Sequence, residues 1–141
     1  MQDNFDDATV LISVKQLANR PEKIKLMNNL KNRVQLIGHL GMTPEIVSFD
    51  KGKKVAKFSL ATNDYYSNEN GEKVQNTEWH TIVAWNRTAE FVEKYLDKGK
   101  QVALEGKLAT RSWEDKEGKK RYSTEVICSE IHVFGPKEKS N

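Results

Sequence analysis

Short runs of alternating apolar and polar residues dominate the sequence from residue 34 onward. Because side chains two positions apart on a β-strand point to the same face, this alternation predicts strands with one buried face. Gly, Pro, Asn and Asp residues separate the runs and supply turns. The predicted strands are Val34–Leu40, Ile46–Phe49, Val55–Asn63, Thr77–Trp85, Gln101–Trp113, Arg121–Cys128 and Ile131–Phe134.

The run Val55–Asn63 alternates most cleanly. Every second residue from Ala56 to Leu60 is apolar and is expected in the core, whereas Lys57 and Ser59 occupy the opposite face. Such a strand fits a sheet that covers a core on one side and meets water on the other.

Glycines and polar residues interrupt the pattern at three places. Gly38, inside the first strand, predicts a bulge or a bend of the kind that a curled sheet needs. Residues 64–76 are polar and predict a loop with Asn70-Gly71 at its tip. Asp115–Gly118 predicts a turn that joins the two strands on either side of it as a hairpin.

One segment, Thr88–Leu96, has a helical period instead. Its apolar residues Ala89, Val92 and Leu96 recur at spacings of three and four. Thr88 is the predicted N-cap, and Lys98-Gly99 provides a basic last turn and a glycine beyond the helix end. The fold class is therefore all-β with one inserted helix. A closed or partly open barrel is its simplest form, because closure removes exposed strand edges.

The length and composition of the chain predict one domain with a polar surface. A chain of 141 residues, 37% hydrophobic and 30% charged, has room for one hydrophobic core. The net charge of +3 permits nucleic-acid binding without demanding it. The single cysteine, Cys128, excludes an internal disulfide and fits the cytosol. Val10–Ile12, the longest apolar run near the start, is too short for a signal peptide or a membrane span.

Residues 1–26 differ from the remainder of the chain. Their acidic and basic residues balance, so the whole net charge lies on residues 27–141. Met27 begins a run that looks like a fresh protein start, so we interpret 1–26 as an N-terminal extension, flexible or partly helical, or as translation from an upstream start codon. The other predicted parts are a domain at 27–134 and a short polar tail at 135–141.

Catalytic and metal-binding patterns are missing from the sequence. The three histidines, His39, His80 and His132, lie far apart, and one cysteine allows no CxxC motif. There is no phosphate-binding GxxxxGK[ST] loop. The acidic cluster around Asp115 falls in a turn, where a solvated role is expected. We therefore expect no enzyme, no metal site and no cofactor.

The stretch TEWHTIVAWNR, Thr77–Arg87, carries the most suggestive pattern. Trp79 and Trp85 fall on one strand face, and Arg87 continues the same series. Two indoles with a cation suit unpaired nucleic acid, in which every base has a π-face and every phosphate a charge. The alternative is that both tryptophans are core and that the face of Ile82 points outward.

Aromatic residues and cations interleave at four places, this stretch included, which strengthens the first reading. A track of this kind fits a single strand, whereas a duplex reader would present a basic helix to the major groove. Plain solvated surface remains the alternative. The four places are Tyr65/Tyr66 with Lys73, Trp79/Trp85 with Arg87, Arg111 with Trp113, and Arg121 with Tyr122.

Several of these motifs also resemble a known family. The segments NRVQLIGHLGMTPE, VAKFSLATN and TEWHTIVAWNRTAEFVEKYLDKGKQVALEGKLATRSWEDKEGKKRYSTEVI are similar, in order and in spacing, to bacterial single-stranded DNA-binding protein. The resemblance covers roughly residues 27–134. It implies an OB-fold, a five-stranded Greek-key barrel with the helix between the third and fourth barrel strands. It also implies a homotetramer that binds single-stranded DNA without enzymatic activity or cofactor.

The resemblance also implies roles for individual residues. The family's stacking aromatics fall on Trp79, Trp85, Trp113 and Tyr66, where Tyr66 replaces a tryptophan and Trp85 a common phenylalanine. Its contacts to the DNA backbone fall on Arg33, Arg87 and Arg111, with Lys57 and Ser59 on the same exposed strand face. His80 matches a histidine that is important for subunit assembly.

Two features depart from the family pattern. The family usually continues into a long linker with an acidic tip that recruits replication and repair proteins, whereas this chain ends at Asn141 with Lys137 and Lys139 nearby. Recruitment by that route is not expected, which weakly favours a specialised copy. The extension 1–26 is the second departure. An OB-fold RNA-binding or primosome-type protein and a protein-assembly factor remain as alternatives, because no residue recognisably reads a 2′-hydroxyl.

Overall fold

The computed structural model describes residues 30–135. Residues 30–33 belong to a unit with the preceding segment, and Val34 begins the second unit. The predicted extension 1–26 and all of the tail beyond residue 135 lie outside the described residues. Within the described part, no helix has the length and apolar character needed to cross a membrane. The elements of the second unit are β1 (Val34–Leu40), β2 (Glu45–Ser48), η1 (Asp50–Gly52), β3 (Lys54–Ser67), β4 (Lys73–Trp85), α3 (Asn86–Tyr95), β5 (Gln101–Glu114) and β6 (Lys120–Val133).

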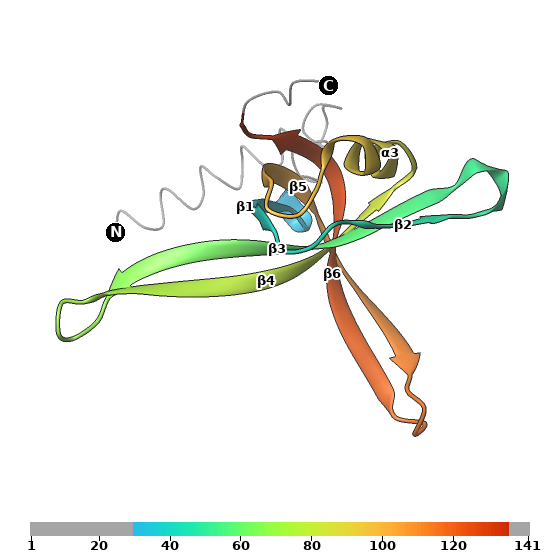
Figure 1. The fold of residues 1–141 in the computed structure, drawn as a ribbon. Coiled ribbons are helices and arrows are strands. Elements are labelled where there is room, and N and C mark those ends of the chain that lie inside the picture. Colours follow the sequence, from blue (N-terminus) through green and yellow to red (C-terminus); the bar gives the residue numbers. More distant parts are fainter. Residues whose placement is uncertain (1–29, 136–141) are drawn as a thin grey trace, which may run out of the picture. The chain divides into compact units, whose positions relative to one another are not determined.

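Five strands close into a barrel (Figure 1). The hydrogen-bonded order is β1-β5-β6-β4-β3, and a short antiparallel pairing of β1 with β3 completes the circle. Among the described residues β2 pairs only with β3, and β4 and β6 run parallel. Since α3 connects β4 to β5, the helix lies between the third and fourth barrel strands. The all-β OB-type barrel expected from the sequence is confirmed.

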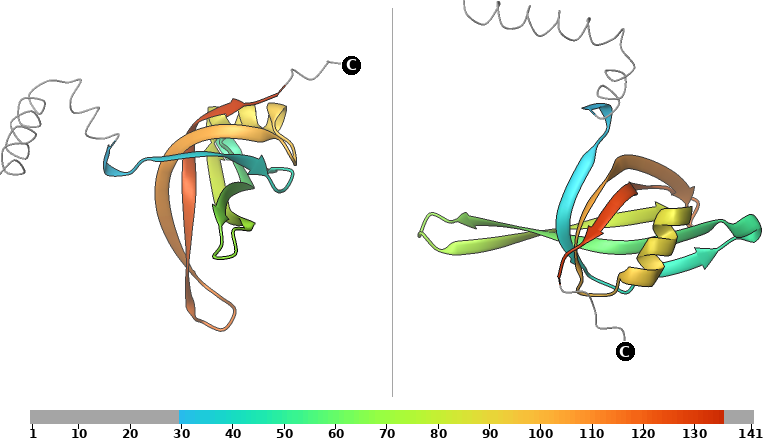
Figure 2. Two further views of the ribbon diagram at one scale, coloured as in Figure 1. Left: turned by 90° about the vertical axis from the view of Figure 1, so that its left-hand side faces the viewer. Right: turned by 90° about the horizontal axis from the view of Figure 1, so that it is seen from above.

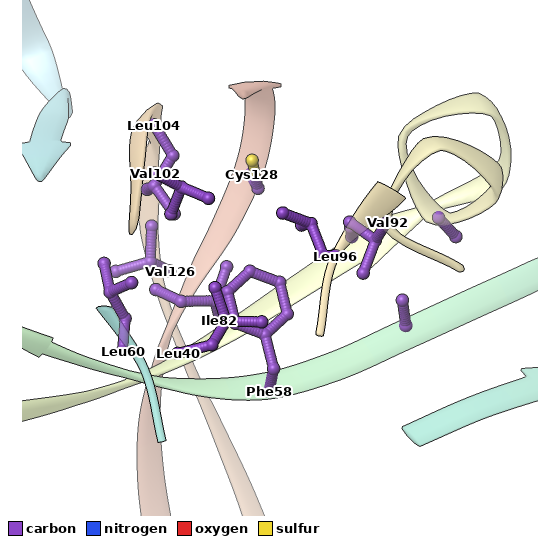
Figure 3. Packing of buried hydrophobic residues seen from close by; sticks show 13 residues of the cluster. Leu40, Phe58, Leu60, Ile82, Val92, Leu96, Val102, Leu104, Val126 and Cys128 are labelled. Carbon is purple, nitrogen blue, oxygen red and sulfur yellow. The ribbon is translucent and has the colours of Figure 1, made fainter. Parts of the chain in front are cut away.

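The barrel interior holds the predicted core (Figure 3). On β3, Phe58 and Leu60 are at most 1% exposed, and on β4 Ile82 is fully buried. Val92 of α3 joins them, so the apolar stripe of the helix packs against the barrel. This arrangement decides which face of β4 is buried and which is exposed. The Ile82 side of β4 faces the core, and Trp79 lies on the outer face, 62% exposed.

The prediction of a polar loop at 64–76 is wrong. β3 continues to Ser67 and β4 begins at Lys73, with regular pairing such as Asp64↔Asn76 between them. Only the tip forms a turn, in which Asn68 Oδ1 accepts hydrogen bonds from the backbone N–H groups of Asn70 and Glu72. The hairpin extends beyond the barrel (Figure 2), so neither face is buried. Without a buried face there is no apolar alternation to reveal the strands.

The strand predictions near β1 and β6 need two corrections. The predicted strands Arg121–Cys128 and Ile131–Phe134 form one strand, β6, with a register shift that leaves Ser129 as an extra residue opposite Glu105 and Gly106. β1 has no bulge in its pairing with β5. Its Gly38 instead permits a close strand approach, because a Cβ there would lie 2.1 Å from the carbonyl oxygen of Ala61.

α3 begins two residues earlier than predicted, and Thr88 is not its N-cap. No side chain caps the first turn, and Asn86 starts the helix with a φ of 50°. Asn tolerates this left-handed conformation better than most residues, and its Oδ1 accepts a hydrogen bond from Lys54 N–H at 3.3 Å. Leu96 is the C-cap, so Gly99 belongs to the following turn and not to the helix end. Because the helix begins directly after Trp85, Arg87 is helical and does not continue the strand series.

Candidate nucleic-acid interface

Trp79 is held at the edge of the outer barrel face. Its six-membered ring lies against Gly41, since a Cβ on that residue would fall 2.3 Å from Trp79 Cζ3 and 2.9 Å from Ser59 Oγ. The side chain as a whole is nevertheless 62% exposed. An exposed aromatic ring that rests against a neighbour suits the stacking of a flat ligand.

A groove lies on the same outer face, at the Trp85 end of β4, and we name it the Trp85 groove. Its volume is about 290 Å³. A smaller hollow that contains Ser59 and Thr81 shares Lys57 with it, so the outer face is hollowed from Ser59, near Trp79, to Trp85. The Trp85 groove is lined by Glu45, Val47, Val55, Lys57, Val83, Trp85, Arg111 and Glu125.

Two groove residues were missed by the sequence analysis. Val83 shares the outer face with Trp85 and lines the groove, but it is only 6% exposed. Glu125 is the one buried charged residue in the part of the chain that the structure describes. Arg111 Nε donates a hydrogen bond to its Oε1 at 3.0 Å. The predicted turn at 115–118 could have revealed this pair, since it places the two residues diagonally across a hairpin.

The β5–β6 hairpin continues the same surface away from the barrel. The Arg111 guanidinium lies 5.4 Å from the centre of the Trp113 ring, and Trp113 is 44% exposed. Cross-strand register places Arg121 opposite Trp113 on this face. Tyr122 points to the other face, beside Lys120, so the expected Arg121–Tyr122 cluster is divided between two faces.

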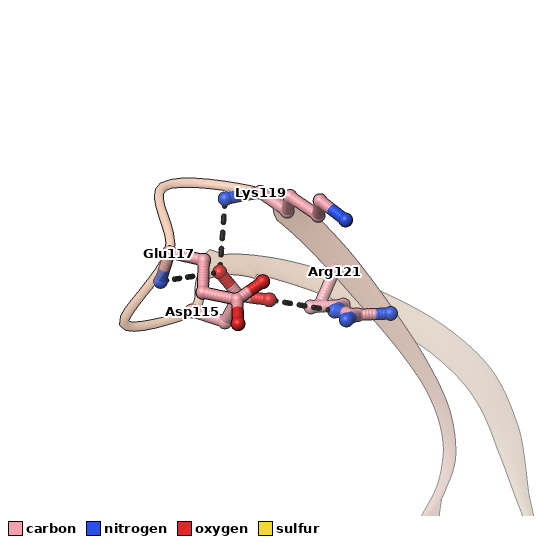
Figure 4. A network of polar contacts seen from close by, with 4 residues as sticks. All are labelled: Asp115, Glu117, Lys119 and Arg121. Atoms are coloured by element: carbon pink, nitrogen blue, oxygen red, sulfur yellow. Dashed lines mark hydrogen bonds and ion pairs between the residues drawn. The ribbon is translucent and has the colours of Figure 1, made fainter.

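Asp115 fixes the tip of this hairpin (Figure 4). Its carboxylate accepts hydrogen bonds from the backbone N–H groups of Lys119 and Glu117 and from Arg121 Nε, each at 2.9 Å. The Lys119 hydrogen bond, followed by that from Arg121, lowers the pKa of Asp115. The carboxylate therefore stays ionised as pH falls toward the usual range of an aspartate, and it keeps Arg121 in place on the outer face.

The β3–β4 hairpin separates the two neighbouring tyrosines. Pairing places Tyr65 opposite Gln75 and Tyr66 opposite Val74. By strand alternation Tyr65 shares the face of Trp79, and Tyr66 shares the face of His80. The Lys73 ammonium lies 4.4 Å from the centre of the Tyr65 ring. Tyr65 was not among the residues predicted to stack on bases, but it extends the aromatic and cationic surface along this hairpin.

The remaining predicted site residues lie in different settings. Arg87 is exposed in the first turn of α3 and forms no ion pair with any described residue. Arg33 directly precedes β1 but belongs to the first unit, so its prediction stays a prediction. His80 is half-buried, and its Nε2 lies 2.9 Å from Thr62 Oγ1.

The described residues contain no cluster of His, Cys, Asp or Glu that could hold a metal ion. Burial raises the pKa of the Cys128 thiol to about 11, so this group is a neutral core residue at physiological pH. What the outer face offers is therefore flat rings, cations and hollows, the chemistry of a binding surface.

Comparison with known proteins agrees with this geometry. Residues 31–134 match the model of the single-strand binding protein family. A single-stranded DNA-binding protein 1 of Chlorobaculum tepidum is 45% identical over 108 residues, which are 76% of this chain and 67% of that protein. A single-stranded DNA-binding protein 1 of Xylella fastidiosa is 41% identical over 78% of this chain and 82% of its own length.

A solved structure supports the same relationship. It is described as a Plasmodium falciparum SSB complex with single-stranded DNA, and it superposes with a TM-score of 0.67 at 35% sequence identity. The similarity covers 74% of this chain and 95% of that one. The family match spans most of the chain and includes every strand of the barrel. The chain belongs to the single-strand binding protein family.

Proposed function

We propose that this protein binds single-stranded DNA without sequence preference and protects it during replication, recombination and repair, at the cytoplasmic nucleoid. The observation that carries the proposal is the outer face of the barrel. Three exposed tryptophans lie along it with arginine and lysine side chains between them. Stacking on such rings tolerates any base, because every base has a π-face, and the cations attract the phosphates.

The residues divide into two groups in this proposal. Trp79, Trp85, Trp113 and Tyr66 stack on bases. The polar contacts to the strand come from Arg33, Arg87, Arg111, Lys57 and Ser59. Lys57 is exposed and opens into both hollows, which supports its place on the DNA path.

A tryptophan-fluorescence titration tests the proposal directly. All three tryptophans lie on the proposed path, so oligo(dT) should quench their emission, and duplex DNA of the same length should do so far less. The logarithm of the binding constant should fall linearly with the logarithm of salt concentration, because each phosphate contact releases counterions. Unquenched emission at saturating oligo(dT), or binding that ignores salt, would contradict the proposal, and stronger binding to oligo(U) would favour an RNA ligand.

Substitution of the two adjacent tyrosines tests how the β3–β4 hairpin is used. If DNA follows the face of Trp79, Tyr65→Ala should weaken oligo(dT) binding by about 1 kcal/mol and Tyr66→Ala should have a smaller effect. If the assignment to Tyr66 is right, the order is reversed. Both side chains are more than half exposed, so both variants should fold and each serves as the control for the other. Fluorescence titration at one salt concentration gives the comparison.

We propose further that the protein assembles as a homotetramer. The outer side of β1 carries Ile37, which is 61% exposed beside a hollow lined by Ala103 and His132. An apolar side chain in that position favours a protein contact. His80 is proposed to serve a subunit contact from the other face of the β3–β4 sheet. Sedimentation equilibrium would measure the mass directly, and a concentration-independent monomer would exclude this assembly.

A further inference from the structure

The Trp85 groove is unusual for a DNA-binding surface because its charges cancel. Its lining includes two cations, Lys57 and Arg111, and two carboxylates, Glu45 and Glu125. The rest of the lining is valine and one indole. A surface that bound mainly phosphate would be expected to carry an excess of positive charge. This groove offers an apolar wall, a π-face and compensated polar groups, which suit a nucleobase better than a phosphate.

Arg111 is the cation of the groove whose position is fixed by its neighbours. Its Nε donates to Glu125 Oε1 at 3.0 Å, and the Glu125 side chain is only 9% exposed. The acceptor is therefore fixed on β6, whereas 58% of the Arg111 side chain remains exposed. The guanidinium also lies 5.4 Å from the centre of the Trp113 ring. Two neighbours thus orient the guanidinium plane, and the tether to Glu125 is made by Nε.

The ion pair with Glu125 also weakens the attraction of Arg111 for a phosphate. Opposite charges only 3.0 Å apart act at longer range as a dipole, so their attraction for a distant anion falls steeply. Arg87, by contrast, forms no ion pair with the described residues and keeps its full charge. A guanidinium plane remains an effective stacking surface for an aromatic ring when its charge is balanced. The two arginines are therefore equipped for different parts of a nucleotide.

We propose that the Trp85 groove is a nucleobase subsite, in which Glu125 orients and neutralises Arg111 so that the guanidinium contacts a base and not a phosphate. Glu125 is then a positioning residue, and Arg87 is the phosphate contact. This assignment rests on the proposed single-stranded DNA binding. It refines the expectation from the sequence, which placed Arg111 among the backbone contacts.

Salt dependence separates the two roles. The double variant Arg111→Gln/Glu125→Gln removes the guanidinium and its balancing carboxylate together. It should weaken oligo(dT) binding about fivefold and leave the slope of log K against log salt unchanged. Arg87→Ala, the matched control, should make that slope shallower by about 0.7, the value for one phosphate contact on a single strand. Arg111→Lys keeps the charge without the planar group and should weaken binding as much as the double variant does. A slope that becomes shallower by about 0.7 in the double variant would overturn the assignment.

Glu125→Gln tests the positioning role. Glutamine keeps a carbonyl acceptor for Arg111 but removes the negative charge, so the slope should become steeper by about 0.7 as Arg111 begins to attract phosphate. A slope equal to that of the parent would contradict the proposed charge cancellation. Thermal unfolding of each variant shows whether the fold is retained, and Arg111→Lys, which leaves Glu125 paired, still decides between base and phosphate if the double variant unfolds.

An abasic oligodeoxynucleotide of the same length distinguishes base from phosphate without salt. At low salt Arg111→Lys and the double variant Arg111→Gln/Glu125→Gln should bind it as well as the parent does, and Arg87→Ala should bind it more weakly. Equal loss on the abasic strand for both arginines would overturn the base contact. A parent protein that binds neither oligo(dT) nor the abasic strand would instead refute the proposed function itself.

Discussion

Replacing Trp79 with alanine should weaken oligo(dT) binding by about 1–3 kcal/mol, or roughly 5- to 150-fold, and leave the fold intact. The indole is 62% exposed and takes no part in the buried core, so its removal creates no core cavity. Its ring is already seated against Gly41, so stacking a base costs little further ordering. Fluorescence titration of the variant is still possible, because Trp85 and Trp113 remain as reporters.

Tyr122→Ala is the matched control for this experiment. Tyr122 is as exposed as Trp79, at 65%, but it lies on the opposite face of the β5–β6 hairpin from Trp113. Loss of this ring should change oligo(dT) binding by less than about 0.5 kcal/mol, as expected for a surface residue away from the contact. If Trp79→Ala binds as well as the parent, or if both variants lose affinity equally, the outer face is not the stacking surface.

The barrel was predictable from the sequence because its strands each have one buried face. Alternation on Val55–Asn63 placed Phe58 inside and Lys57 outside, and both are found there. On β4 alternation alone left two readings, since tryptophans suit both a core and a stacking surface. The fully buried Ile82 and the exposed Trp79 separate them. Alternation gives the two faces of a strand, and the closure of the barrel decides which is inner.

The hairpin extensions and the groove were not predictable in the same way. Residues 64–67 and 73–76 lie outside the barrel, so their pairing leaves no apolar signal in the sequence. No local pattern distinguishes Glu125 from the surface acids, and only the cross-strand register set by the turn at 115–118 places it beside Arg111. The seat of Trp79 depends on Gly41, which is 38 positions away in the sequence and adjacent only in the folded barrel. The alternation of residues within one strand shows which side chains share a face. The features described here arise instead from contacts between strands that are distant in the sequence.

The closure of the barrel by β1 and β3 is the feature on which the whole outer face depends. Only two residue pairs, His39↔Ala61 and Leu40↔Leu60, join these strands. Gly38 lies beside them at the closest approach, where a Cβ would be 2.1 Å from Ala61 O and 2.9 Å from Ala61 C. Both atoms belong to the backbone, so no side-chain rotation can relieve the contact.

Gly38→Ala should therefore lower the free energy of unfolding by about 3 kcal/mol, at the upper end of what overpacking costs. No left-handed φ is required at this position, so the expected loss comes from the clash and not from backbone strain. Urea unfolding at fixed protein concentration gives the magnitude, since association would otherwise shift the midpoint. Hydrogen exchange should show early opening of the Gly41 amide, which donates to the carbonyl oxygen of Ser59 across this seam.

His39→Ala is the control for this prediction, because His39 is the neighbouring residue on the same seam and its side chain is exposed. It should change stability by less than about 0.5 kcal/mol. Opening the seam moves β3 and with it Ser59 and Lys57, so Gly38→Ala should also weaken oligo(dT) binding at temperatures where the protein is still folded. If Gly38→Ala is as stable as His39→Ala, the approach of β1 to β3 is looser than the barrel requires, and the outer face does not depend on that closure.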